Sequence, residues 1–415
     1  MNSAHRCLAH LDRGLDKLIA AGLLLLALTL YLRSDVRSSW RAVLLLMVCL
    51  AGVHVLIRGK ALWQGLHPQI RPLLLFWLCF VLVTLLTAWT GNTFPASQQQ
   101  LLQNFLLPAS LPFLATLYLS DAGRLRLLGW AFLGGLCISL FRNLAQYVEE
   151  WRLLGGLTND IHQHRLFADS LVFGLPFLLA ALASSRRFAW RYVAGLALCM
   201  TLGMILLTGA RGAWLASGVG TLGFLLLRRD RNVLYTLLGL GLAGGVALAL
   251  LGPGEIVAHK IQQGFDTSQR TSGTWGPSLA MIKDRPLLGY GFGSEVYHET
   301  FNHRVAGEPG WTIKTSQGPH NIFLATGFAT GLPGLGLFLL ACCAPLVLMF
   351  RRIWPTRRAS LQGPPADEHI LGVALCAVFL SALLTQGMFE GRSWPPIAFW
   401  LGASLAWLNR QLKAQ

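Results

Sequence analysis

Several residues that suit phosphate binding and proton transfer lie at or near the ends of apolar segments. His320 follows Pro319 at the start of a long apolar run, and Arg211 begins another in TGARGAWLA. Arg142 lies inside a third apolar run, and Arg270 lies in the polar stretch that precedes His320. Arginine holds phosphate oxygens bidentately and stays charged at any working pH. Histidine titrates near neutrality and can accept a proton from an incoming hydroxyl.

This combination suits glycosyl transfer from a lipid diphosphate. Such a reaction stabilises the departing diphosphate and removes the proton of the acceptor hydroxyl. A metal ion is one way to stabilise the diphosphate, but arginines suffice in principle. A lipid diphosphate anchored in a membrane would present its anion at the depth of these arginines.

Each residue also has a purely structural interpretation. Arg211 can snorkel from a helix end, Arg270 can be a surface charge, and His320 can simply begin a helix. Arg142 is harder to explain in this way, because an arginine two turns inside a span usually has an anionic partner. The pair His162 and His164 lacks the Cys or carboxylate support of a metal site. Trp275 and Trp311 suit a loop core or an interfacial belt as well as a sugar platform.

The composition predicts a membrane protein. Hydrophobic residues make up 54% of the chain and charged residues 13%, against roughly 25% charged residues in an ordinary globular protein. The 34 Lys and Arg exceed the 18 Asp and Glu by 16, but they lie between apolar runs and give no nucleic-acid footprint. Seven of the eight cysteines also lie inside apolar runs, so no disulfide framework is expected. A soluble enzyme and a disordered chain are excluded.

The apolar runs predict an all-α polytopic membrane protein with about twelve transmembrane helices. A hydrocarbon core of ~30 Å needs about 20 apolar residues per helix. Lys and Arg in alternate loops predict cytoplasmic N- and C-termini. The run at 320–350 is too long for one span, and its TGLPG sequence at 330–334 predicts a break. The expected runs are 15–32, 41–57, 73–89, 101–119, 127–148, 165–184, 190–207, 211–227, 233–252, 320–350, 369–386 and 392–408.

One polar stretch divides the chain into three parts. Residues 1–252 hold spans one to nine, 253–319 form a large outer loop, and 320–415 hold spans ten to twelve. The amphipathic piece at 255–265 can lie on the membrane surface. The many aromatic residues of the loop predict an ordered cap.

Other chemistries lose support. The chain contains no P-loop, GxSxG or HExxH motif, which weighs against ATP hydrolysis, serine hydrolysis and zincin chemistry. A proton-coupled transporter would bury acidic residues in mid-span, whereas Asp169 and Glu390 lie near predicted outer ends. Secondary transport is weakened but stays open.

A motif then indicates a family. The segment HNIFLATGFATGLPG reads His320, Asn321, nine residues, Gly331, two residues and Gly334. This spacing resembles the signature of the O-antigen ligase and polymerase superfamily. TGARGAWLA resembles that family's arginine-bearing start of a span, and RTSGTWGPSLAMIKDRPLLGYGFG at 270–293 resembles its loop segment. The motifs cover about 205–345, and hydropathy alone covers the rest.

Within the superfamily the chain most resembles lipopolysaccharide O-antigen ligases, which have one large outer loop and a short C-terminal region. The resemblance implies a GT-C-like, inverting glycosyltransferase that needs no metal and no cofactor. It would move a glycan from undecaprenyl diphosphate to a sugar of the lipid A core, at the periplasmic face of the inner membrane. Its partners would be these two substrates and membrane lipids, without nucleic acid.

The resemblance also implies roles for residues. Arg211 and Arg270 would hold the diphosphate, and His320 would be the general base. Asn321 would orient His320 or bind a sugar hydroxyl. Further substrate-binding candidates are Arg142, Trp275 and Arg392. Two enzymes with the same donor remain as alternatives, an O-antigen polymerase and a protein O-oligosaccharyltransferase, and a transporter of polyprenyl-linked glycan is a third.

Overall fold

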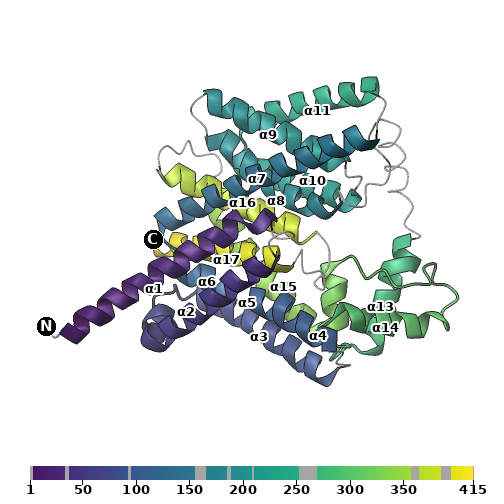
Figure 1. Ribbon diagram of the computed structural model, residues 1–415, viewed down its shortest axis with the longest axis horizontal. Helices are drawn as coiled ribbons and strands as arrows, with labels where there is room; N and C mark the ends of the chain where they lie inside the picture. The colour runs from purple at the N-terminus through teal and green to yellow at the C-terminus, as the bar shows by residue number, and fades with distance from the viewer. Residues whose placement is uncertain are drawn as a thin grey trace.

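The computed structural model describes residues 3–32, 37–91, 95–154, 165–184, 188–207, 210–251, 269–356, 364–384 and 394–414. Over these ranges all regular structure is helical, which confirms the predicted all-α class (Figure 1). The helices before the large loop are α1 (Ser3–Leu28), η1 (Leu30–Leu32), α2 (Arg37–Gln64), α3 (Ile70–Thr90), α4 (Pro95–Gln100), η2 (Leu101–Leu106), α5 (Leu107–Ala109), α6 (Leu111–Tyr118), α7 (Ala122–Leu154), α8 (Arg165–Ser184), α9 (Phe188–Leu207), α10 (Arg211–Arg228) and α11 (Arg231–Leu251). The loop holds η3 (Gln269–Thr274), α13 (Trp275–Asp284) and α14 (Ser294–Val305), and α15 (Ile322–Thr356), α16 (Pro364–Ala382) and α17 (Trp394–Lys413) follow it.

Every predicted apolar run falls on a helix, although the run at 101–119 is interrupted. Its prolines, Pro108 and Pro112, lie at the starts of α5 and α6, where a missing N–H costs no helical hydrogen bond. By length and composition, six stretches of the described residues are long and apolar enough to cross a membrane. The count of twelve spans therefore stays a prediction. The six are Ser38–Gln64, Ile70–Thr90, Gln98–Tyr118, Ala122–Gln146, Ala189–Leu206 and Ile322–Thr356.

The helices connect two opposite ends of the protein. At one end, which we call the loop end, α3 contacts the loop through Gly91, which lies close to Gly291. At the other, the terminal end, the first turns of α3 meet the last turns of α17, where Asn409 Oδ1 accepts a hydrogen bond of 2.9 Å from the His67 N–H. Both termini of the ribbon lie away from α13 and α14 (Figure 1).

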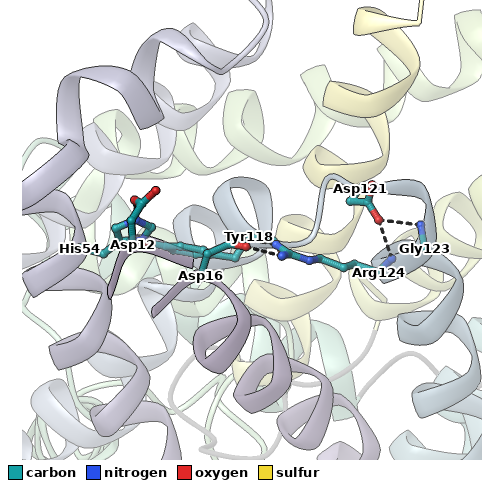
Figure 2. Close-up of polar contacts among 7 residues, drawn as sticks. All are labelled: Asp12, Asp16, His54, Tyr118, Asp121, Gly123 and Arg124. Atoms are coloured by element: carbon teal, nitrogen blue, oxygen red, sulfur yellow. Dashed lines mark hydrogen bonds and ion pairs between the residues drawn. The ribbon is translucent and has the colours of Figure 1, made fainter. Parts of the chain in front are cut away.

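A polar network holds the terminal end together (Figure 2). The buried ring of His54 lies between the Asp12 carboxylate, at 2.8 Å, and the Tyr118 hydroxyl, at 3.1 Å. Arg124 pairs with Asp16 and donates to the Tyr118 carbonyl at 2.8 Å. Buried polar groups cost free energy unless they are paired, so this network fixes α1, α2, α6 and α7 relative to one another.

Nearer the loop end the helices pack through aromatic rings. Trp77 of α3 stacks on Trp394 of α17 with ring centroids 5.3 Å apart. Phe105 of η2 stacks on Trp394 at 5.0 Å and meets Phe292 of the loop at 5.1 Å. The loop therefore shares the hydrophobic core of the membrane helices.

The helix α15 is broken near its start, as the TGLPG sequence predicts. Gly331 has φ 68° and ψ −173°, so Ile322–Thr330 and the rest of α15 are separate helices. Pro333 lacks the N–H that would bond the Ala329 carbonyl in a continuous helix. The Gly291 N–H bonds this carbonyl instead, at 3.1 Å.

Two more backbone hydrogen bonds complete this contact. The Tyr290 N–H donates to the Phe328 carbonyl at 2.9 Å, and the Leu332 N–H donates to the Pro286 carbonyl at 2.7 Å. The groups left unpaired by the break are thus satisfied by the loop segment 286–291. We call this set of three bonds the backbone clamp.

Glycines allow the clamp to close. Gly289 has φ 61°, and a Cβ there would lie 2.5 Å from the Phe328 carbonyl oxygen. A Cβ on Gly331 would lie 2.6 Å from the Pro286 carbonyl oxygen. Both positions combine a left-handed backbone with contact between main chains, so only glycine fits them.

We predict that Gly289→Ala and Gly331→Ala each lower the free energy of unfolding by about 2 kcal/mol or more, through strain and collision. Gly336→Ala is the matched control, because Gly336 lies on α15 beyond the break and has nothing within 4 Å of its Cβ position. Thermal melting of the detergent-purified proteins measures the difference. Equal melting temperatures for all three variants would contradict the clamp.

Candidate functional site

His320 lies at the loop end, directly before the first helix of α15, and its side chain is exposed. Its φ is 44°, and among the described residues only Arg229 is another non-glycine with positive φ. This conformation costs an L-residue on the order of 1 kcal/mol, so the surrounding structure must hold it. This backbone conformation places His320 just before the start of the first helix of α15.

Asn321 caps this helix. Its side-chain oxygen accepts hydrogen bonds from the Phe323 N–H at 2.9 Å and the Leu324 N–H at 3.1 Å. Capping satisfies two N–H groups that have no partner within the helix. The Asn321 oxygen is thus committed to the cap, and only the side-chain NH₂ is left for the predicted contact with a sugar.

The helix α14 holds the segment that leads to His320. His298 lies 2.8 Å from the Ser316 hydroxyl, measured from Nδ1 to Oγ. The side-chain oxygen of Asn302 accepts a bond of 3.2 Å from the Ser316 N–H. Four residues before His320, the chain is therefore fixed to α14.

Arg270 lies on η3, which packs against the same segment. The Thr312 N–H donates to the Ser272 carbonyl at 3.1 Å. Gly273 lies so close to Ile313 that a Cβ would meet its Cδ1 at 2.8 Å. The backbone that carries Arg270 and the backbone that leads to His320 are thus in direct contact.

A buried hydroxyl pair fixes η3 from the other side. Ser278 Oγ lies 2.7 Å from both the Thr274 carbonyl oxygen and the Tyr297 hydroxyl. Because Ser278 has one hydroxyl proton and gives it to the carbonyl, the Tyr297 hydroxyl is the donor to Ser278. The Tyr297 ring also meets Phe328 of α15 edge-on, at 4.8 Å. The side chains of Ser278 and Tyr297 together thus link η3, α13, α14 and the first helix of α15.

This burial changes the acidity of Tyr297. Loss of water on burial raises the pKa of Tyr297 from 10.0 to about 12. From the sequence, Tyr297 is expected only as one of the aromatic residues of an ordered cap, and no role is predicted for His298. Both belong to the aromatic-rich loop that is expected to be ordered, but no motif distinguishes them.

The two other arginine candidates also belong to helices that reach the loop end. Arg211 is the first residue of α10, and the same half of α10 meets the last turn of α16, where Ser381 Oγ donates to the Ala216 carbonyl at 3.0 Å. The first turn of α10 is fixed to α9 by Trp214, whose ring N–H donates to the Ile205 carbonyl at 2.9 Å. Arg142 is half-buried on α7, which continues beyond the expected end at 148 to Leu154.

The remaining candidates are less informative. Trp275 begins α13 and is 37% exposed. Arg392, the pair His162 and His164, and the amphipathic piece at 255–265 lie outside the described residues. Among the residues that are described, no group of three or more His, Cys, Asp or Glu could hold a metal ion.

An open cavity of about 510 Å³ runs along one face of the C-terminal half of α7. Its walls are mainly apolar, with one acidic and one basic residue toward the end of the helix. The lining residues are Phe141, Leu144, Ala145, Val148, Glu149 and Arg152.

These features define a class of protein. It is a multi-pass helical membrane protein in which a polar loop packs on a broken helix, with a histidine at the start of that helix. A family model described as O-antigen ligase matches residues 194–339, which include α10, the loop and the break in α15. An O-antigen ligase of Salmonella typhimurium is 30% identical over 296 residues, which cover 68% of each chain. The chain belongs to the O-antigen ligase family.

We predict that Asn321→Ala lowers the free energy of unfolding by about 1 kcal/mol, because the first helix of α15 loses its cap. Asn321→Asp keeps an oxygen acceptor and is expected to melt close to the wild-type temperature. Melting of the two purified variants tests this. Equal destabilisation by both changes would show that capping is not the role of Asn321.

We also predict that the pKa of Tyr297 makes stability depend on pH above 10. Below pH 10 the phenol is protonated in the folded and the unfolded protein. Between pH 10 and 12 the unfolded state loses the proton first, so the free energy of unfolding falls, by on the order of 2 kcal/mol.

Tyr297→Phe should remove this part of the pH dependence, whereas Tyr235→Phe, at a residue that is 65% exposed, should keep it. Melting temperatures between pH 8 and pH 12 provide the measurement. Identical pH profiles for Tyr297→Phe and the wild type would refute the assignment.

Proposed function

We propose that this protein transfers a glycan from undecaprenyl diphosphate to a sugar of the lipid A core, at the periplasmic face of the inner membrane. Membership of the O-antigen ligase family supports the reaction class. The observation that supports the roles of Arg270 and His320 is the packing of η3, which carries Arg270, against the segment that leads to His320. This contact brings the backbone that carries the candidate anion ligand against the segment that leads to the candidate base.

His320 acts as the general base in this proposal. Its ring accepts the proton of the acceptor hydroxyl as the oxygen attacks the anomeric carbon of the glycan. The bond from that carbon to the diphosphate oxygen breaks, and the configuration at the carbon inverts. Exposure of His320 at the loop end supports this role, because the acceptor must reach the ring.

The arginines stabilise the leaving group. Arg270 and Arg211 bind the diphosphate, whose negative charge grows as the bond breaks. Arg142 and Arg392 are proposed to help bind the donor, and Trp275 to contact a sugar. The start of α15 adds the positive end of a helix dipole beside His320. The mainly apolar cavity on α7 suits a lipid chain.

Transfer by reconstituted protein tests the proposal. We predict that His320→Ala slows glycan transfer by about 10²–10⁴-fold, the usual contribution of a general base. His303→Ala is the matched control, because His303 lies on α14 with a side chain that is 85% exposed. A His320→Ala protein with the wild-type rate would overturn the role of His320.

The same assay separates the arginines and the alternatives. Arg211→Ala and Arg270→Ala should abolish transfer, while Arg231→Ala, at an exposed residue of α11, should not. EDTA should leave the rate unchanged, and inhibition reversed by a divalent metal would contradict the metal-free mechanism.

The products of the same assay distinguish the alternative functions. Elongated lipid-linked glycan would indicate a polymerase, and modified protein an oligosaccharyltransferase. Movement of glycan across vesicles without a new bond would indicate a transporter.

A further inference from the structure

An exposed turn of the loop carries apolar side chains that the fold leaves uncovered. Residues 283–288, which we call the leucine turn, are all exposed. Leu287 is 69% and Leu288 51% exposed. Leu279, one helical turn before Lys283 on α13, is 48% exposed. A cluster of exposed leucines marks a surface that contacts lipid or another apolar partner.

The leucine turn is rigid. Its Pro286 carbonyl accepts the Leu332 N–H at 2.7 Å in the backbone clamp. The Gly289 N–H donates to the Arg285 carbonyl at 3.0 Å and closes the turn. The exposure of the leucines is therefore a property of the fold.

The turn continues a surface that faces lipid. Leu332, bonded to the turn, is 54% exposed and follows the break in α15, within the apolar stretch Ile322–Thr356 that is long enough to cross a membrane. Further along the same helix, Leu340 and Val347 are 50% and 49% exposed, at helical spacing. The leucine turn thus continues the exposed apolar side of the second helix of α15 toward the loop end.

The helix α3 independently indicates the depth of the leucine turn relative to the lipid headgroups. Its exposed side contains Leu82 and Leu86 and ends at Trp89, which is 86% exposed. Tryptophan at this position is typical of the boundary between hydrocarbon and headgroups. Gly91, two residues later, contacts the Tyr290 carbonyl. The leucine turn is therefore connected through Tyr290 to the level of the headgroups.

The charges of the turn complement phosphate. Lys283 and Arg285 are both exposed, and the Arg285 guanidinium lies over the Tyr290 ring at 4.6 Å. The one acidic residue among them, Asp284, pairs with Arg304 of α14. The turn therefore combines positive charge with exposed leucines, as segments that lie in anionic interfaces do.

We propose that the leucine turn inserts into the membrane leaflet at the loop end, with Leu287 and Leu288 among acyl chains and Lys283 at phospholipid phosphates. Because the backbone clamp joins the turn to the first helix of α15, this contact sets the height of His320 above the leaflet. That last consequence rests on the proposed function, whereas the insertion itself does not.

Photo-cross-linking of the full-length protein tests the insertion. A benzophenone amino acid replaces Leu287 in nanodiscs of equal parts phosphatidylglycerol and phosphatidylcholine, and mass spectrometry identifies the adducts. Replacement of Leu340 is the positive control, and replacement of His303 on α14 is the negative one. Position 288 repeats the test if the first variant is poorly produced.

We expect at least about ten-fold more lipid adduct at position 287 than at 303, since burial of an apolar side chain is favourable by more than that factor. Phosphatidylglycerol should dominate the adduct, and Lys283→Gln should reduce its excess by about five-fold. Equal capture at 287 and 303, or adducts with a second protein copy, would overturn the proposal. An adduct without preference for phosphatidylglycerol would overturn the role of Lys283. None of these readouts requires transfer activity.

Discussion

The backbone clamp between the loop and the broken helix α15 determines the arrangement of the loop end. A proline inside a helix leaves a carbonyl without its donor, and in a membrane no water replaces it. Here the Ala329 and Phe328 carbonyls receive the N–H groups of Gly291 and Tyr290, so the loop repairs the break. Neither part is satisfied without the other. The polar loop is therefore fixed to the apolar helix α15 by main-chain hydrogen bonds, in addition to the ring contact of Tyr297 with Phe328.

The same constraint links the two motif segments of the sequence. GLPG in α15 and PLLGYG in the loop are more than 40 residues apart, yet Gly331 and Gly289 meet within the clamp, where a Cβ on Gly289 would lie 2.7 Å from the Gly331 nitrogen. Their glycines are required by close packing of main chains. The family motif is therefore in large part a structural signature, and among its residues His320 stands apart because it is exposed and strained.

The sequence predicted those features that depend on local pattern. Hydropathy predicted helices at each apolar run, and the Gly-Leu-Pro-Gly sequence predicted the break, because both follow from one segment alone. It did not predict the roles of Tyr297 or His298, since a buried hydroxyl pair and a fixed turn depend on contacts between distant segments. Asn321 shows the middle case. The family resemblance implied that Asn321 orients His320 or binds a sugar hydroxyl, whereas the geometry commits its oxygen to a cap.

The positive charge of the chain has at least three distinct structural settings. Arg124 is paired with Asp16 in the polar network of the terminal end, where it holds helices together. Lys283 and Arg285 are exposed beside leucines at the loop end, where a lipid surface complements them. Arg270 is carried on a turn that both Ser278 and Thr312 hold in place. An arginine that only snorkels needs no such support, because its long side chain finds the headgroups from any nearby backbone. A backbone that is held on two sides suits an arginine that must bind an anion at a set distance from a second group. Here the segment that contacts the Arg270 backbone leads to His320.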